Sequence, residues 1–460
     1  MAVRFGGAND GFSGRGRNET MSSEVLISID PEHFLGPIKP MNCVNNGPVG
    51  SKNTQCRSNF DEYAALKIPF ARTHDASFYA GYGGEHTVDV AAVFPDFSRD
   101  PDDPSAYDFV LTDEYLQRTI AAGTQIFYRL GTKIEHWKKK YNTLPPRDFR
   151  KWAKICEHII RHCNEGWADG FFGNIRWWEI WNEPDIDLDD DKDKRCWGGT
   201  AAQFRDLYRI TSVHLKSCFP DLMIGGPAQT AQFDQWMDDF LALRTPSGER
   251  IPLDFYSWHQ YTEDPARLQV LAEKIRRKLD AADYTGTLSI LDEYNYVRDW
   301  KENFVYSIRQ IQNEKGAAFI ASCMCMGQNA PIDMLIYYDA RPCVFNGIFD
   351  FYTLEKRKTY SAFSAFAVLR ELKNQISCVS NDPRISCIAA RNEKRLAILL
   401  STYRIKDGGK GQNIRIDSTL PLHNIKASLT DWKNDSTVLP AAGKTFRLRP
   451  NSILLFEAEI

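Results

Sequence analysis

Short apolar runs alternate with longer segments of helical periodicity between residue 36 and residue 373. This alternation is typical of repeated βα units, in which each strand joins a parallel sheet and each helix covers it. The runs that predict strands begin at Pro37, Ile68, Thr124, Ile175, Leu222, Asp254, Leu288 and Asp333. Helical periodicity lies between them at residues 58–67, 113–122, 147–164, 202–218, 234–243, 265–281 and 315–326. Eight such strands predict an α/β fold, a (β/α)8 TIM barrel over residues 36–373.

The pattern changes after residue 373 to short alternating strands separated by turn signals. Residues 374–460 therefore predict an accessory β-sandwich domain, and residues 25–35 predict a strand that precedes the barrel and joins that domain. We expect this domain to stabilise the barrel or to mediate contacts in a homo-oligomer. Residues 1–24 lack an apolar core and predict a disordered terminus or an artificial extension.

Two carboxylates stand at the ends of predicted barrel strands. Glu183 follows Asn182 and precedes Pro184 at the end of the aromatic run WWEIWNEPD, and Glu293 ends the run LSILDEYNY. Parallel barrels carry their chemistry at the carboxyl ends of the strands. A Glu at the end of a strand is often only the ion-pair partner of a nearby Arg. Two such residues, each at the end of an apolar run, also fit a catalytic role. Glycoside hydrolysis needs two carboxyl groups that flank one bond.

Composition excludes several other classes of protein. The 57 basic and 60 acidic residues give a net charge of −3 without a basic cluster, so we expect no nucleic-acid partner and a neutral substrate. No apolar stretch reaches the roughly 20 residues of a membrane span, so we expect no membrane partner. The sequence lacks the HExxH and GxxxxGK[ST] motifs of metal and phosphate sites. Cys323 and Cys325 form a CxC within an apolar segment, which predicts that they pack in the core. We therefore expect no metal and no cofactor.

The eleven cysteines are odd in number and irregularly spaced. This distribution favours a reduced protein over a disulfide-linked secreted one. The sequence therefore predicts a cytoplasmic location, provided that no signal peptide preceded the first residue.

Several motifs resemble one enzyme family over nearly the whole chain. They are KPMNCVNNGP at 39–48, FARTHD at 70–75, EIWNEPD at 179–185, FRDLYRITSVHLKSCFPDLMIGGP at 204–227, FYSWHQY at 255–261 and LDEYN at 291–295. The chain resembles the retaining glycoside hydrolases of clan A, and most of all family 39, the β-xylosidase and α-L-iduronidase family. The resemblance implies a double displacement in which a glycosyl-enzyme intermediate forms and is hydrolysed.

The resemblance also implies roles for single residues. Glu183 corresponds to the general acid/base and Glu293 to the nucleophile, while Asn182 corresponds to a partner of the sugar 2-hydroxyl. We expect Arg72 and Tyr261 to donate hydrogen bonds that keep Glu293 ionised.

Other residues are expected near the sugar because of their positions at strand ends or in the loops that follow. They are His259, Asn46, His74, Asp75, Trp137, Tyr338 and Asp339. The chain departs from the family at the eighth strand, where relatives often carry a Trp and this sequence reads IYYDARPC. Tyr337 or Tyr338 could supply the aromatic surface there, and Lys133 and Glu135 add charge after the third strand.

These observations predict an exo-acting β-xylosidase that cleaves plant-type oligosaccharides or glycosides. Other specificities of the same family stay open: arabinosides, other β-glycosides, endo-acting cleavage, or uronides, for which Lys133 or Arg341 could bind the carboxylate. A barrel that binds carbohydrate without turnover is the alternative outside the enzymes.

Overall fold

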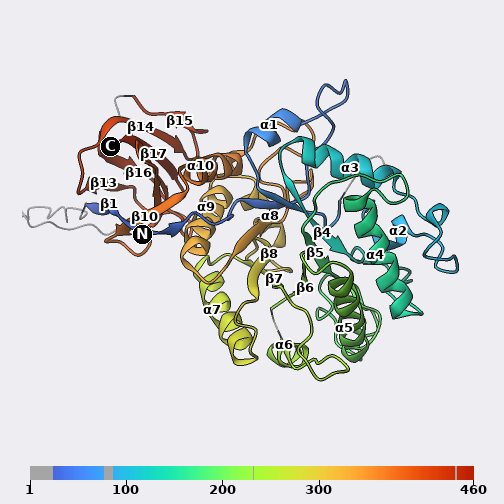
Figure 1. Ribbon diagram of the computed structural model, residues 1–460. Helices are drawn as coiled ribbons and strands as arrows, with labels where there is room; N and C mark the ends of the chain where they lie inside the picture. Colours follow the sequence, from blue (N-terminus) through green and yellow to red (C-terminus); the bar gives the residue numbers. More distant parts are fainter. Residues whose placement is uncertain (1–23, 77–85, 232, 441–442) are drawn as a thin grey trace, which may run out of the picture.

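Parallel strands form a closed barrel in the centre of the molecule (Figure 1). The computed structural model describes residues 24–76, 86–231, 233–440 and 443–460. In this part of the chain the barrel strands are β2 (Cys43–Asn45), β3 (Phe70–Arg72), β4 (Gln125–Leu130), β5 (Trp177–Ile180), β6 (Met223–Gln229), β7 (Phe255–Thr262), β8 (Leu288–Tyr296) and β9 (Met334–Tyr337). Each pairs with the next, and β9 pairs with β2. The predicted TIM barrel is confirmed.

Helices surround the barrel and are present at all seven predicted places, with ends shifted by a few residues. In the described residues they are α1 (Phe60–Ala65), α2 (Val90–Val93), α3 (Val110–Ala121), α4 (Phe149–Glu165), α5 (Ala201–Cys218), α6 (Asp234–Leu241), α7 (Ala266–Ala281), α8 (Phe304–Ile311), α9 (Glu314–Asn329) and α10 (Lys358–Leu372), with a 3-10 turn at Pro104–Ala106. No helix of the described residues is long and apolar enough to cross a membrane.

The sequence did not predict α2, α8 and α10. The omission of α10 has a physical cause, because this helix lies between the barrel and the second sheet and is buried on more than one side. Its sequence KTYSAFSAFAVLREL therefore lacks the single apolar stripe that identifies a surface helix.

The helices on either side of β5 have well-defined ends. Asp148 caps α4 by accepting hydrogen bonds from the backbone N–H groups of Arg150 and Lys151. Thr200 and Gln203 form a capping box at the start of α5. These caps fix the two helices that lead into and away from the strand carrying Glu183.

A second sheet lies beside the barrel (Figure 1). Among the described residues its order is β15-β14-β17-β12-β11-β10-β1-β13-β16. The bounds are β1 (Val25–Pro37), β10 (Asn374–Ser380), β11 (Ser386–Arg391), β12 (Arg395–Ser401), β13 (Gln412–Ser418), β14 (His423–Thr430), β15 (Thr437–Val438), β16 (Thr445–Leu448) and β17 (Ile453–Glu459). Strand β1 pairs antiparallel with β10 and parallel with β13. We predicted that residues 1–24 are disordered or an artificial extension. Of these, residues 1–23 lie outside the described residues.

The alternation of side chains along β12 explains how the sheet attaches to the barrel. Leu396, Ile398 and Leu400 belong to the core of the sheet domain. Ala397 and Leu399 belong instead to the large core that includes the barrel, α9 and α10. Because successive side chains point to opposite faces of a strand, one strand contributes to both cores. The second sheet is therefore packed against α9 and α10.

Candidate active site

Glu183 lies in a sharp turn just after β5. The residues Trp181 and Glu183 have positive φ angles of 78° and 45°, a conformation that side chains other than Gly rarely adopt. The backbone N–H of Trp181 donates to the carbonyl of Leu130 at 2.6 Å, and that of Glu183 donates to the carbonyl of Ala228 at 2.9 Å. Bonds to the neighbouring strands on both sides thus stabilise the strained turn and fix the carboxyl group at the barrel end.

Glu183, His259 and Glu293 converge from β5, β7 and β8. One side-chain oxygen of each glutamate and one ring nitrogen of His259 all lie within 4.8 Å of one another. His259 Nδ1 is 2.8 Å from Glu183 Oε1 and 3.6 Å from Glu293 Oε2. The two glutamates that stand 110 positions apart in the sequence therefore face one another across a small space.

Arg72 at the end of β3 holds the inner side of this space. It is fully buried and donates from Nη1 to Glu293 Oε1 at 2.8 Å and from Nη2 to Asn182 Oδ1 at 2.6 Å. Its Nε donates to Glu179 Oε2 at 2.7 Å and lies 3.0 Å from Asp292 Oδ2. One guanidinium thus contacts three carboxyl groups and the amide of Asn182.

Sequence reasoning did not identify Glu179 and Asp292, although each is a charged residue inside an otherwise apolar strand. Burial, with the charge of Asp292, raises the pKa of Glu179 well above its usual range despite Arg72. Burial alone would also raise the pKa of Asp292, but the charges of Arg72 and His259 outweigh it and lower that pKa. Below Arg72 the structure therefore favours a neutral Glu179 beside an ionised Asp292.

The immediate surroundings of Glu293 include the two expected donors. Besides the bond from Arg72, the Tyr261 hydroxyl donates to Glu293 Oε2 at 2.8 Å. Burial nevertheless raises the pKa of Glu293 to about 7, and the charge of Glu183 adds to this, while His259 and Arg72 oppose it. The donors alone do not make Glu293 a strong acid, because desolvation of the carboxylate is the larger effect.

His259 has different neighbours from those expected of a sugar ligand. Its Nε2 is 3.5 Å from Asp292 Oδ1, so both ring nitrogens face carboxylates. Burial alone would lower the pKa of His259, but Glu293, Asp292 and Glu183 raise it well above its usual range. An imidazolium has no lone pair for a metal ion. The spacing of Glu183, His259 and Glu293 could hold a metal, but this charge state favours hydrogen bonding instead.

An outer group of polar side chains surrounds Arg341. The Arg341 side chain lies 3.3 Å from Asp339 Oδ2 through Nε and 3.6 Å from Asp75 Oδ2 through Nη2. Tyr338 donates from its hydroxyl to Asp75 Oδ2 at 2.8 Å, and Asn46 Nδ2 donates to Asp339 Oδ1 at 3.1 Å. Arg341 is therefore already engaged by two carboxylates of the protein.

Burial raises the pKa of Asp339 to about 6, although Arg341 opposes it. One residue connects this outer group to the glutamates. His74 Nε2 lies 3.8 Å from both Asp75 Oδ1 and Glu293 Oε1. His74 thus lies between the outer group and Glu293.

Aromatic side chains line the same side of the site. Trp300, on the loop after β8, lies edge-on to Tyr261 with ring centroids 5.1 Å apart, and Phe304 stacks on Trp300 at 5.7 Å. Phe345 contacts Tyr338 at 5.6 Å. Trp300 is 54% exposed, so part of its ring is open to solvent. Sequence reasoning missed Trp300; its position seven residues after Glu293 was the available signal.

The loops after β4 and β5 contribute fewer side chains to the site around the two glutamates than the sequence predicted, with one exception. The carboxylate of Glu135 accepts hydrogen bonds from the backbone of Tyr141 and Thr143, so it organises its own loop. Trp137 is half-exposed beneath Lys133, and no interaction recorded among the described residues joins it to either glutamate. The exception is Cys196, which sequence reasoning missed and whose Sγ lies 3.9 Å from Glu183 Oε2.

Comparison with known proteins gives consistent matches. The family model for glycosyl hydrolases family 39 matches residues 25–397. A β-xylosidase from Caldicellulosiruptor saccharolyticus is 24% identical over 364 residues, which cover 71% of this chain and 69% of that protein. A β-xylosidase from Geobacillus stearothermophilus is 32% identical over 152 residues, 32% of this chain and 26% of that protein.

Solved structures share the fold. The structure of a glucosidase from Croceicoccus marinus has a TM-score of 0.78 at 21% identity, covering 95% of this chain and 99% of that one. A monomeric β-xylosidase from Caulobacter crescentus has a TM-score of 0.67 at 16% identity, covering 94% and 99%. Both the barrel and the second sheet lie within these matches.

Proposed function

The chain belongs to family 39 of the glycosyl hydrolases, and from this premise we propose that it is a retaining, exo-acting β-xylosidase. The protein is an O-glycosyl hydrolase that acts on oligosaccharide or glycoside substrates. The bond stereochemistry, the sugar and the mode of attack are the proposed part.

The distance between the two glutamates is the observation that carries the proposed mechanism. Oxygens of Glu183 and Glu293 lie within 4.8 Å of each other. Retaining enzymes hold their carboxyl groups about 5 to 5.5 Å apart, whereas inverting enzymes need about 6.5 to 9.5 Å to fit a water between carboxylate and sugar. The short distance supports direct attack by a carboxylate.

In the first step, Glu293 forms a bond to the anomeric carbon while Glu183 passes a proton to the departing glycosidic oxygen. In the second step, Glu183 accepts a proton from water, and that water breaks the ester to Glu293. Arg72 and Tyr261 hold the two oxygens of Glu293 in place for attack. His259 contacts Glu183 Oε1, and Cys196 lies beside Oε2.

Asn182 is oriented for a contact with the sugar. Its Oδ1 accepts from Arg72, which fixes the amide plane, and its buried Nδ2 has no hydrogen-bond partner among the described residues. A buried donor without a partner costs free energy that a substrate hydroxyl would recover. This supports Asn182 Nδ2 as the donor to the 2-hydroxyl.

The xylosyl specificity is proposed from the relatives and from the state of the cations near the site. The two curated relatives are named β-xylosidases. A uronide would need a free cation for its carboxylate, but Arg341 is bound to Asp75 and Asp339, and Lys133 lies over the ring of Trp137. The neutral sugar is therefore favoured.

We also propose that the enzyme works in the cytoplasm. The eleven cysteines are all unbridged in the described residues, and an unbridged set supports a reducing compartment.

The test is release of 4-nitrophenol from the β-D-xyloside, α-L-arabinoside, β-D-glucoside and α-L-iduronide, with the wild type, Glu183→Gln and Glu293→Gln measured in parallel. We expect release from the xyloside and its loss in Glu293→Gln. NMR of the first-formed sugar anomer decides between retention and inversion. Preference for another glycoside would overturn the specificity, and an inverted anomer would overturn the mechanism. Full activity of Glu293→Gln would overturn the site.

A further inference from the structure

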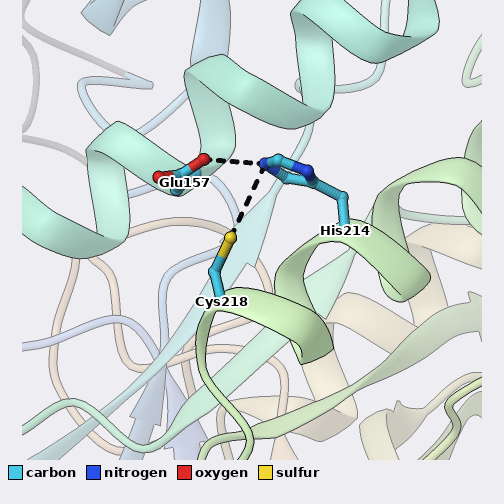
Figure 2. A group of neighbouring side chains, drawn as sticks. All are labelled: Glu157, His214 and Cys218. Atoms are coloured by element: carbon cyan, nitrogen blue, oxygen red, sulfur yellow. Dashed lines mark hydrogen bonds and ion pairs between the residues drawn. The ribbon is translucent and has the colours of Figure 1, made fainter.

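A second group of side chains of the kinds that bind metals lies on two helices outside the barrel strands (Figure 2). Glu157 projects from α4, and His214 and Cys218 project from α5, one turn apart. One ligand atom of each lies within 4.8 Å of the others. We propose that these three side chains bind a zinc ion that joins α4 to α5.

The distances between the ligand atoms suit a tetrahedral ion after small adjustments. His214 Nε2 is 2.8 Å from Glu157 Oε2 and 4.0 Å from Cys218 Sγ. Tetrahedral zinc with its usual bond lengths separates nitrogen from oxygen by about 3.4 Å and nitrogen from sulfur by about 3.6 Å. The first separation therefore has to lengthen by about 0.6 Å and the second to shorten by about 0.4 Å.

Of the neighbouring cations, Arg161 contacts one oxygen of Glu157 and Lys154 contacts both, so zinc must displace Lys154 from Oε2. Arg161 Nε binds Glu157 Oε1 at 2.8 Å, and its Nη1 binds Glu165 at 2.5 Å. Lys154 lies 3.2 Å from Glu157 Oε2 but is also 3.4 Å from Asp102, so its partly exposed side chain has another carboxylate to pair with. The bond from Arg161 to Oε1 orients Oε2 toward the metal, as second-sphere contacts do in metal sites.

The charges balance when zinc binds. The S–H bond of Cys218 breaks and its proton passes to solvent as a zinc–sulfur bond forms. The proton by which His214 Nε2 bonds to Glu157 Oε2 is also released to solvent, and the neutral ring keeps its proton on Nδ1, so that Nε2 and the ionised Glu157 can both bind the ion. The ion and its two anionic ligands then sum to zero charge. Because the thiol must lose its proton to bind the ion, binding strengthens as the pH rises.

The position in the fold decides what the metal does. Glu157 is buried, whereas the side chain of His214 is 32% exposed, so the fourth position on the ion is open to water. Cys218 ends α5 just before β6, at the end of the barrel opposite Glu183 and Glu293. Metals there stabilise a fold and take no part in chemistry at the other end. The helix C-terminus, which carries partial negative charge, favours a cation.

The experiment treats the full chain with a chelator, removes the chelator, and titrates the protein with ZnCl2 or CdCl2. We expect one equivalent of cadmium to produce the ultraviolet charge-transfer band of a cadmium–thiolate bond, and excess zinc to raise the Tm by about 3 °C. Cys56→Ser, which removes an exposed cysteine elsewhere, is the matched control and should behave as the wild type.

Cys218→Ser should remove both the band and the gain in Tm, and His214→Gln should weaken both at least tenfold in metal concentration. A band that survives in Cys218→Ser, including one carried by Cys196, overturns the proposal. So does an unchanged Tm in the wild type. Two variants on different side chains keep the test decisive if one of them folds poorly.

Discussion

Two carboxylate–histidine pairs in this molecule have the same distance and different surroundings. Glu183 and His259 are 2.8 Å apart, as are Glu157 and His214. The inner pair faces two more carboxylates, Asp292 and Glu293, which raise the pKa of His259. The outer pair lies among cations, and the chemistry of the two pairs follows from those neighbours.

The outer pair shows the opposite shift. Burial alone would raise the pKa of Glu157, but hydrogen bonds from Arg161, His214 and Lys154 lower it to about 2. The outer carboxylate is thus held ionised among cations, whereas burial and the charge of Glu183 raise the pKa of Glu293 to about 7 beside the inner pair. The same two residue types therefore serve different purposes.

The largest difference in activity should be seen between Glu293→Gln, which changes a carboxylate facing the inner pair, and Glu157→Gln, which changes the outer pair. We expect Glu293→Gln to lose at least about 10⁴-fold in kcat/KM on an aryl xyloside, because the attacking group is removed. Glu157→Gln should keep kcat/KM within about twofold. Steady-state kinetics of both variants test this, and a large loss in Glu157→Gln would show that the outer pair supports the inner one.

Glu183→Gln should lose about 10² to 10⁴-fold in kcat, as expected for removal of a general acid/base. The loss should be smaller for aryl glycosides with good leaving groups, since these need no proton. Added azide should restore turnover and produce the glycosyl azide, because this nucleophile needs no base. Failure of azide to rescue the variant would count against Glu183 as the acid/base.

Arg72→Met should destabilise the protein far more than Arg161→Met. Removing the buried guanidinium breaks its contacts with Glu179, Asp292 and Glu293, a change that costs about 3 to 5 kcal/mol. The Arg161 side chain is partly exposed, and pairs open to solvent contribute about 0 to 1 kcal/mol. Urea unfolding of both variants measures the difference, and equal effects would contradict it.

The pH dependence of stability should differ between the wild type and Glu293→Gln. The pKa of Glu293 is raised from 4.5 to about 7, so its contribution to stability is fully present below pH 4.5 and is lost as the pH rises through about 7. Because Gln cannot ionise, the variant should gain up to about 3 kcal/mol on the wild type between pH 4.5 and pH 8. Unfolding at pH 5 and pH 8 checks this. A gap that is constant with pH would mean that Glu293 titrates normally.

The smallest effect is expected for His214→Gln without metal. In this pair the His214 side chain is partly exposed and that of Glu157 is buried. We therefore expect a loss of at most about 1 kcal/mol in the free energy of unfolding. His259→Gln should instead lower kcat, since the buried imidazolium lies between both glutamates. A larger loss of stability for His214→Gln than for His259→Gln would reverse the comparison.

Much of the fold was predictable because its signals are local. The barrel strands were readable as apolar runs between turns, and the amphipathic helices by their period of 3.6 residues. The exceptions were α10, which is buried on more than one side, and the short α2 and α8. Local patterns do not reveal how a segment is covered by distant parts of the chain.

The residues of the site also fall into those that local patterns predicted and those that they did not. Glu183 and Glu293 were predicted because each follows an apolar run, and Arg72 and Tyr261 because they lie toward the ends of barrel strands. Trp300 and Cys196 lie in loops without a pattern of their own, yet one contacts Tyr261 and the other lies beside Glu183. Loop residues are placed by tertiary contacts, which a single sequence does not reveal.

The sequence by itself determined the barrel, the second sheet and the strand ends that carry the two glutamates, because alternation and periodicity are properties of neighbouring residues. Only the tertiary structure decided which charges meet. It placed Glu179, Asp292 and Glu293 around Arg72, and it brought His214 and Cys218 to Glu157. Protonation and metal binding depend on the field of groups far apart in the chain, and that field exists only after folding.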